Sequence, residues 1–263
     1  MSTLRKALDR FSKQSSWLIA LDFDGCLAPI VPHPDDARPL PQAAAALQRL
    51  APVPNLQVAL VSGRALESLV LVATPPPGTL LVGSHGAERG MIDDDGTLTL
   101  SNAQLSPGQQ RVLAQATAVA TEVIAPVSAA GAWLEQKPTA VVVHTRALPP
   151  QLADQIESDV LTATASMQLR ALPGKRVVEL CVVPTSKGIA LDDLRASTGA
   201  SVVLYAGDDV TDEDALARLR PGDVGVKVGP GTTAARFRVA DPAAIAAMLT
   251  HLADLFGAGP AAA

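Results

Sequence analysis

Residues 17–25 read Trp-Leu-Ile-Ala-Leu-Asp-Phe-Asp-Gly, and this stretch decides the fold. Its apolar part is uninterrupted, which is typical of a strand buried on both faces of a parallel sheet. The strand ends in two carboxylates, Asp22 and Asp24, although aspartate is disfavoured in strands and an unpaired buried charge is costly. A turn at Gly25 would need only one of them. Because ligands of open α/β sheets bind at the carboxyl ends of the strands, the pair predicts a functional site.

The chain around this strand alternates apolar strands with Ala- and Leu-rich segments of helical period. This pattern is typical of a parallel sheet with helices on both faces. The acidic turn at residues 93–96 instead indicates a hairpin. The predicted strands are 17–23, 57–61, 80–82, 202–206 and 224–228, and the predicted helices are 41–50, 66–72, 186–195, 211 onward and 241–255.

Residues 104–183 break this alternation. Ser106, Pro107 and Gln109 form a strong helix start, with Ser as N-cap and Gln placed to close a capping box. We therefore predict an α/β fold with a Rossmann-like parallel sheet formed by residues 1–103 and 184–263, and an inserted α+β domain at 104–183. After its first helix, the insertion has predicted strands at 133–137 and 140–145, a helix at 150–163, and strands at 168–171 and 177–183.

Composition excludes several classes of function. The chain has 263 residues and a net charge of −5 without a dense Lys/Arg block, so we expect no nucleic-acid partner. No apolar run approaches the roughly 18 residues needed to span a bilayer, and residues 1–10 lack the apolar core of a signal peptide. Cys26 and Cys181 lie far apart, which disfavours a disulfide framework and a zinc site. We expect a cytoplasmic monomer that does not bind membranes.

A second acidic cluster follows the predicted strand 202–206. Residues 205–214 read Tyr-Ala-Gly-Asp-Asp-Val-Thr-Asp-Glu-Asp. Thr211 is expected to cap the next helix, and residues 212–214 suit the positive end of its dipole. For these three acids a structural role is at least as good an interpretation as a functional one. Asp208 and Asp209 precede the expected cap, so helix chemistry does not account for them.

If both strand ends lie at one edge of the sheet, Asp22, Asp24, Asp208 and Asp209 converge. Two like charges about 4 Å apart repel by ~4 kcal/mol at an effective dielectric of 20, so four carboxylates call for a cation. All-oxygen ligation at a site open to water suits Mg²⁺, which keeps several waters and shares a phosphate oxygen. The sequence therefore predicts a magnesium site.

Two further positions are suited to binding an anion. Ser62 begins the stretch Ser-Gly-Arg after a predicted strand, where a hydroxyl and backbone N–H groups at a helix start hold phosphate. Ser62 is equally well interpreted as a plain N-cap. Lys187 lies in the first turn of a predicted helix, where a cation opposes the macrodipole by ~0.3–1 kcal/mol. A dianionic phosphate would offset that cost.

These residues, in this order, resemble the motifs of the haloacid dehalogenase-like phosphohydrolase superfamily. Its pattern is Asp-x-Asp after strand one, Ser or Thr after strand two, Lys at a later helix start, and an acidic pair after strand four. One departure is Cys26, where the family usually has Thr; it puts a local hydrogen bond in doubt but removes no charge used in the chemistry. The matching residues are Asp22 and Asp24, Ser62, Lys187, and Asp208 and Asp209.

Within that superfamily the chain looks like the trehalose-6-phosphate phosphatases over nearly its whole length. The stretch Gly-Asp-Asp-Val-Thr-Asp-Glu at residues 207–213 is the most diagnostic. The resemblance implies that the inserted domain is a cap. The other matching stretches are residues 22–25 with Pro29-Ile30, 62–64, 84–88, Glu135-x-Lys137, His144-x-Arg146, Gly174-Lys175 with Glu179, and Lys187-Gly188.

The resemblance also implies roles for the residues at the strand ends. Asp22 would attack phosphorus to give an aspartyl-phosphate, and Asp24 would protonate the leaving sugar oxygen and then activate water. Lys187 and Ser62 would hold the phosphoryl group. The implied ligands of Mg²⁺ are the Asp22 carboxylate, the Asp24 backbone carbonyl and Asp208, with Asp209 in support.

The implied sugar contacts are polar side chains of the cap. They are equally interpreted as the solvent-facing alternates of half-exposed strands. Because only 3% of the residues are aromatic, we expect hydrogen bonds rather than stacking to dominate recognition of the sugar. The candidate substrate-binding residues are Arg64, Glu135, Lys137, Arg146 and Glu179.

The leading hypothesis is a Mg²⁺-dependent phosphatase acting on trehalose 6-phosphate. Its nearest rival is a related capped phosphatase acting on sucrose phosphate or mannosyl-glycerate phosphate. Residues 207–213 and Glu135-x-Lys137 favour trehalose. A third hypothesis is a catalytically silent phosphosugar-binding module. The presence of Asp22, Asp24 and Lys187 argues against it, because a silent site does not need the whole catalytic set.

Overall fold

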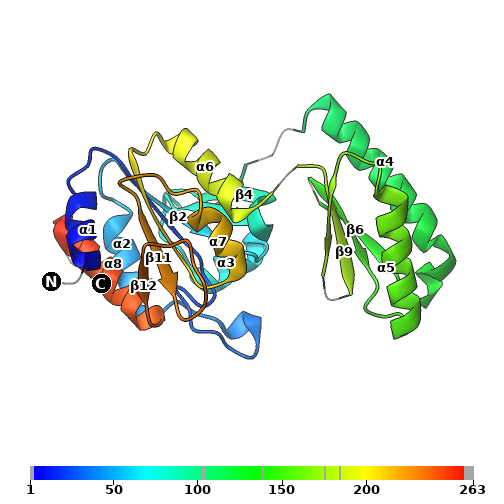
Figure 1. The fold of residues 1–263 in the computed structure, drawn as a ribbon, viewed down its shortest axis with the longest axis horizontal. Helices are drawn as coiled ribbons and strands as arrows, with labels where there is room; N and C mark the ends of the chain where they lie inside the picture. The colour runs from blue at the N-terminus through cyan, green and yellow to red at the C-terminus, as the bar shows by residue number, and fades with distance from the viewer. Residues whose placement is uncertain (1–2, 102–104, 138, 175, 184, 258–263) are drawn as a thin grey trace. The chain divides into compact units, whose positions relative to one another are not determined.

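The computed structural model describes residues 3–101, 105–137, 139–174, 176–183 and 185–257 (Figure 1). These residues form two compact units. The first contains the residues up to 101 together with those from 186 onward, and the second contains the residues between them. The expected domain boundary at 103/104 lies outside the described residues, as does Pro184 at the other expected boundary.

The first unit is built on an eight-stranded sheet with the order β12-β11-β10-β1-β2-β3-β4-β5. The strands from β12 to β3 are parallel to their neighbours, and β4 and β5 add an antiparallel edge. The strands are β1 (Trp17–Leu21), β2 (Leu56–Val61), β3 (Leu80–Gly83), β4 (Glu88–Ile92), β5 (Leu98–Leu100), β10 (Val202–Gly207), β11 (Val224–Val228) and β12 (Phe237–Val239).

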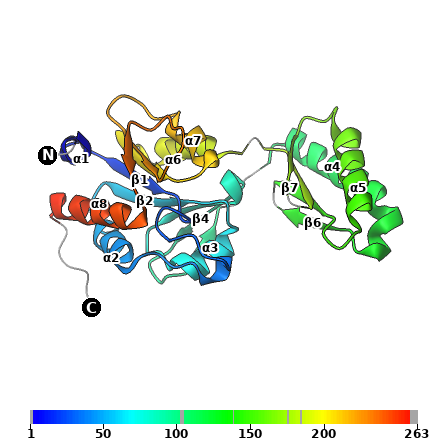
Figure 2. The ribbon, with the colours of Figure 1, turned by 60° about the horizontal axis from the view of Figure 1, so that its bottom comes forward.

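Helices cover both faces of this sheet. Ile19 and Leu21 of β1 belong to the core formed with α1, α2, α3 and α8, whereas Leu18 and Ala20 belong to the core formed with α6 and α7. Figure 2 shows α2 and α8 on one side of the sheet and α6 and α7 on the other. Burial on both faces explains the uninterrupted apolar run and confirms the predicted fold class. The helices are α1 (Thr3–Phe11), α2 (Pro41–Leu50), α3 (Leu66–Ala73), α6 (Lys187–Thr198), α7 (Val210–Leu216) and α8 (Pro242–Leu255).

The second unit is a four-stranded antiparallel sheet with the order β6-β7-β9-β8. Two helices cover one of its faces, where Val141, Val143, Val178 and Leu180 pack against Ala116, Ala120 and residues of α5. The capping box predicted at Ser106 and Gln109 is present. The elements are α4 (Pro107–Ile124), β6 (Trp133–Lys137), β7 (Ala140–His144), α5 (Pro150–Thr164), β8 (Arg170–Pro173) and β9 (Val177–Cys181).

On the other face of this sheet no helix packs among the described residues of the unit, and this face carries polar side chains. Trp133, Glu135 and Lys137 alternate with the core-facing Leu134 along β6, and they pair in register with His144, Val142 and Ala140 of β7. Because side chains alternate along a strand, these residues share one face with Val177 and Glu179 of β9. We call this surface the open face.

Two elements were not expected from the sequence. Helix α1 was read only as a charged terminus, although Leu4, Ala7, Leu8 and Phe11 follow the helical period and contact the core. Strand β12 has three residues and lies at the sheet edge, too short for a pattern of alternation to be read.

One helix of the second unit is long and apolar enough to cross a membrane by length and composition alone. The segment Pro107–Ala130, which is α4 with the short helix η3 (Ala125–Ala130), contains an 18-residue window of mean hydropathy 1.4. Alanines scattered among Thr and Gln give this value without a continuous apolar run. In the structure Ala116, Ala120 and Ile124 of α4 pack against the sheet, and helices of soluble proteins meet the same criterion.

Candidate active site

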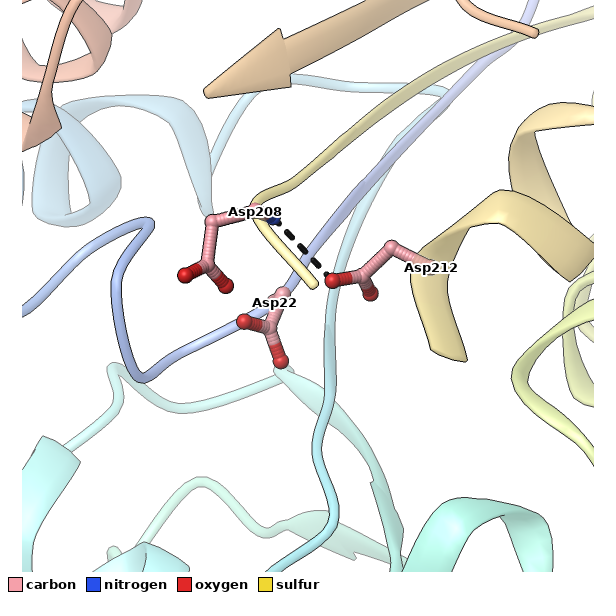
Figure 3. A group of neighbouring side chains, drawn as sticks. All are labelled: Asp22, Asp208 and Asp212. Carbon is pink, nitrogen blue, oxygen red and sulfur yellow. Dashed lines mark hydrogen bonds between the residues drawn. The ribbon is translucent and has the colours of Figure 1, made fainter. Parts of the chain in front are cut away.

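Adjacent strands bring two acidic residues to one edge of the large sheet. Asp22 follows β1 and Asp208 follows β10, and Leu21 lies opposite Ala206 in the parallel register. The Asp22 amide donates to the Ala206 carbonyl at 2.9 Å. Oxygens of Asp22, Asp208 and Asp212 all lie within 4.8 Å of one another (Figure 3). These three carboxylates, called the acidic cluster below, could hold a metal ion.

Lys187 reaches the acidic cluster from the first residue of α6. Its Nζ donates to Asp22 Oδ1 and to Asp212 Oδ1, both at 2.7 Å, and its side chain is 3% exposed. Burial by itself lowers the pKa of Lys187, but the two carboxylates outweigh burial and hold that pKa above its usual value. Burial raises the pKa of Asp22, against the effect of Lys187.

Asp212 is the member of the cluster that sequence reasoning missed, because it was assigned to the helix dipole. It is fully buried, and its Oδ2 accepts from the backbone N–H groups of Asp208 and Asp209 at 3.1 and 2.9 Å. Figure 3 draws the bond to Asp208. Its Oδ1 also accepts from the buried hydroxyl of Tyr205 at 2.7 Å. Asp212 therefore joins Lys187, Tyr205 and the loop after β10.

The N-cap of α7 is Asp209 and not Thr211, which corrects the expectation. The Asp209 side chain accepts from Val210 N at 2.7 Å and forms a capping box with Asp212. Helix chemistry therefore does account for Asp209. Asp209 lines the site cavity, but it is not one of the three acids that converge among the described residues.

Asp24 is held by Arg64. Arg64 Nε donates to Asp24 Oδ2 at 2.6 Å and Nη2 donates to Oδ1 at 2.7 Å. Nη2 also donates to the carbonyl of Pro34 at 2.8 Å, and the guanidinium lies over the ring of Phe23. The hydrogen bond to Asp24 raises the pKa of Arg64. Such bidentate pairs are geometrically specific.

Ser62 is not a helix cap, because α3 begins at Leu66 with Ala65 in the cap position. The Ser62 side chain is buried at the end of β2, and its Oγ accepts from Arg64 N at 3.2 Å. A cavity of about 730 Å³ opens over these strand ends. It brings together the predicted residues Asp22, Asp24, Ser62, Arg64, Lys187, Asp208 and Asp209, with His85 beside them.

His85 lines this cavity from a strained turn. Ser84 and His85 have φ values of 47° and 55°, in the left-handed region that non-glycine residues seldom adopt. Their N–H groups donate to the carbonyls of Arg64 and Ser62 at 2.7 and 3.0 Å. A Cβ on Gly63 would lie 2.5 Å from the imidazole, so any larger residue there would force the imidazole or the loop to shift. The sequence shows the Ser-His-Gly stretch but not its strain.

Lys227 of β11 was also not singled out from the sequence. It is 4% exposed, and its Nζ donates to the carbonyls of Asp208 and Asp209 at 2.5 and 3.4 Å. It also pairs with Glu213 at 3.4 Å. A buried lysine thus fixes the backbone of the loop that carries Asp208.

The remaining predicted residues belong to the second unit. On its open face Lys137 donates to Glu179 at 3.2 Å, and Glu135 lies 2.9 Å from His144 Nε2. Arg146 follows β7 and lines a separate cavity of about 430 Å³ together with Trp133 and His144. Lys175 lies outside the described residues.

The fold defines the class of protein. A haloacid dehalogenase-like hydrolase from Bacteroides thetaiotaomicron superposes on this chain with a TM-score of 0.61 at 15% identity. The superposition covers 90% of this chain and 100% of that one. The trehalose-6-phosphate phosphatase of Aspergillus fumigatus superposes with a TM-score of 0.71 at 24% identity, covering 96% of this chain and 98% of that one. Both likenesses concern the fold.

Sequence comparison then identifies the family. The model of the trehalose-phosphatase family matches residues 20–243, so the chain belongs to this family. A trehalose-phosphate phosphatase of Mycobacterium avium is 36% identical over 250 residues, which are 90% of this chain. The alignment spans 62% of that relative's length.

Proposed function

We propose that this protein is a Mg²⁺-dependent phosphatase that hydrolyses trehalose 6-phosphate to trehalose and phosphate through an aspartyl-phosphate. The observation that carries the proposal is the buried Asp22 carboxylate, held by Lys187 at the base of a cavity that also contains Asp24, Ser62 and Asp208. Family membership supports the choice of substrate class.

Asp22 is the proposed nucleophile. Its carboxylate attacks phosphorus, the bond between phosphorus and the sugar oxygen breaks, and the leaving oxygen takes a proton from Asp24. Water then attacks the phosphorus of the aspartyl-phosphate, Asp24 accepts the proton of that water, and phosphate leaves with Asp22 regenerated. Lys187 and Ser62 bind phosphoryl oxygens during both steps.

Asp24 must leave Arg64 to exchange protons with the substrate. Two hydrogen bonds from Arg64 occupy both oxygens of this carboxylate, whereas proton exchange with a leaving group requires one of these oxygens to be free. We therefore assign Arg64 to the substrate, whose phosphate or hydroxyl oxygens compete with Asp24 for the guanidinium. Substrate binding then frees the acid at the moment when it is needed.

The donor set fits Mg²⁺. The acidic cluster offers carboxylate oxygens only, which are the ligands that Mg²⁺ prefers. Burial raises the pKa of Asp22 and of Asp208. We propose Asp22, Asp208 and the Asp24 carbonyl as ligands, with Asp209 and Asp212 orienting the loop. When bound there, Mg²⁺ neutralises charge on the phosphoryl oxygens.

We propose residues 1–103 and 184–263 as the catalytic domain and residues 104–183 as a cap that selects the sugar. The open face of the cap carries an ion pair of Lys137 with Glu179, and Glu135 lies within hydrogen-bond distance of His144. Such groups donate to and accept from hydroxyls, and Arg146 adds a further donor. The substrate is a small water-soluble molecule, in keeping with a cytoplasmic monomer.

A panel of sugar phosphates tests the function. Phosphate release is measured from trehalose 6-phosphate, sucrose 6-phosphate, a mannosyl-glycerate phosphate and p-nitrophenyl phosphate, with Mg²⁺ or with EDTA. We expect trehalose 6-phosphate to be hydrolysed with the highest kcat/KM and EDTA to abolish turnover. A preference for another sugar phosphate would reassign the substrate, and tight binding without any turnover would indicate a silent sensor.

A further inference from the structure

Trp133 is an exposed aromatic residue at the start of the edge strand β6. Its side chain is 52% exposed, and it stacks on His144 with ring centroids 4.0 Å apart and planes at 3°. The two residues are directly opposite each other in the register of β6 and β7. The other tryptophan, Trp17, instead donates its indole N–H to Phe11 and packs on Phe256.

Polar groups surround this stacked pair. Glu135 is the next residue of β6 on the same face, and its carboxylate lies 2.9 Å from His144 Nε2, which fixes the plane of the imidazole. The cavity of about 430 Å³ at this end of the sheet is lined by Trp133, His144 and Arg146. Its volume falls in the range of small-molecule sites. Gly131 and Ala147 complete the wall, and a Cβ on Gly131 would lie 2.6 Å from the Ala147 side chain.

We propose that Trp133 and His144 form an aromatic platform on which a pyranose ring stacks, with Glu135 and Arg146 binding its hydroxyls. A pyranose ring offers an apolar C–H face and a rim of hydroxyls, and this site pairs an aromatic surface with a carboxylate and a guanidinium. The expectation that hydrogen bonds dominate recognition of the sugar rested on the low aromatic content, which does not show where the aromatic residues lie.

The length of the open face favours a disaccharide. Trp133 and Lys137 are four residues apart on one strand, which at about 3.3 Å per residue is roughly 13 Å, close to the length of two linked pyranoses. The Lys137–Glu179 pair then contacts one ring and the platform contacts the other ring. This assignment rests on the proposed function, because it takes the substrate to be a disaccharide phosphate.

Fluorescence tests the platform without turnover. The Trp17→Phe, Asp22→Asn double variant carries Trp133 as its only tryptophan, and it is titrated with trehalose 6-phosphate, trehalose and inorganic phosphate. We expect a saturable change in emission with trehalose 6-phosphate and with trehalose, and none with phosphate. An equal change with phosphate, or no change with either sugar, would overturn the platform.

Substitution tests the stacking. With trehalose 6-phosphate, Trp133→Ala is expected to raise KM about tenfold with a smaller effect on kcat, Trp133→Phe to restore most of the affinity, and Trp133→Leu to restore little. Equal rescue by Phe and Leu would mean that the residue only fills space. A dimer that Trp133→Ala converts to a monomer would assign the indole to an interface between copies and overturn the platform.

Separate outcomes would refute the proposed function and the aromatic platform. If the wild type does not hydrolyse trehalose 6-phosphate while trehalose still changes the Trp133 emission, the platform stands and the proposed function fails. If trehalose 6-phosphate is hydrolysed while Trp133→Ala keeps the wild-type KM, the function stands and the platform fails.

Discussion

Arg64 grips both oxygens of Asp24 through two nitrogens of its guanidinium, at 2.6 and 2.7 Å. This pair joins the loop after β2 to the loop after β1, directly beside the buried Asp22. Asp24, the proposed acid–base residue, is therefore already paired with the Arg64 guanidinium before substrate binds. Arg64 is thus suited to bind the substrate as well as to hold Asp24 in place.

Loss of Arg64 tests this reading. Arg64→Ala should raise KM for trehalose 6-phosphate at least tenfold, because hydrogen bonds to charged groups are worth about 1.5–3 kcal/mol. Arg64→Lys should recover only part of the loss, since an ammonium lacks the planar fork. Steady-state phosphate release measures both variants. An unchanged KM would limit Arg64 to holding Asp24 in place.

Removal of the nucleophile should abolish turnover and spare the fold. Asp22→Asn keeps the shape of the side chain and leaves Lys187 its bond to Asp212, so we expect a native circular-dichroism spectrum. Phosphate release should fall to background with every substrate. Turnover at more than about one per cent of wild type would exclude Asp22 as nucleophile.

Metal removal should make stability depend on pH. Burial raises the folded-state pKa of Asp22 and of Asp208. A raised acid pKa contributes stability below the unfolded value of about 3.9, and this contribution is lost as the pH rises through the folded value. In EDTA the melting temperature should therefore fall as the pH rises above the unfolded value of about 3.9.

Mg²⁺ should offset that fall, because it binds the ionised carboxylates. At a hundredfold excess over Kd the gain is about 2.7 kcal/mol, or roughly 5–10 °C in melting temperature. Thermal melts of the wild type and of Asp208→Asn, with and without Mg²⁺, measure it. Identical melting curves with Mg²⁺ and EDTA would contradict the metal site.

Glu179 should matter for the sugar and not for the phosphoryl group. Glu179→Ala removes the partner of Lys137, and kcat/KM for trehalose 6-phosphate should fall about a hundredfold, whereas that for p-nitrophenyl phosphate should change less than threefold. Asp192→Ala, which breaks the exposed pair with Arg218, is the matched control. Equal losses on both substrates would refute a role in reading the sugar.

Gly63 should be intolerant of a methyl group because of His85. The added Cβ of Gly63→Ala would lie 2.5 Å from the imidazole, so the loop carrying Ser62 and Arg64 must shift and activity should fall at least tenfold. The double variant Gly63→Ala, His85→Ala should lose less than the sum of the two single losses in free energy. If the two single losses in free energy add up to the loss of the double variant, Gly63 and His85 act independently.

The features that could be predicted from the sequence are those set by residues close together in the chain, such as apolar strands and helix caps. The carboxyl ends of parallel strands lie at one edge, so the apolar runs before Asp22 and Asp208 were enough to bring these residues together. The Ser106 capping box was equally local. Family resemblance added roles to positions that the pattern had already selected.

The features that could not be read depend on contacts between distant segments. Asp212 and Thr211 are both good residues for a first helical turn, and only the backbone of residues 208–209 decides that Asp209 is the cap. In the sequence Lys227 is one more residue of a predicted strand. Its role appears only in the fold, where its ammonium donates to the carbonyls of Asp208 and Asp209. The stack of Trp133 on His144 likewise needs the register of β6 and β7.

The bond between Lys187 and Asp22 spans 165 positions of the chain. At synthesis rates of about 5–20 residues per second, the ribosome makes the lysine roughly 8–33 s after the aspartate. When Lys187 is made, β2 has been synthesised but β10, the opposite neighbour of β1 in the sheet, has not. An interrupted translation product that stops before residue 187 therefore carries the aspartate without its ammonium, and premature termination yields no partly active enzyme.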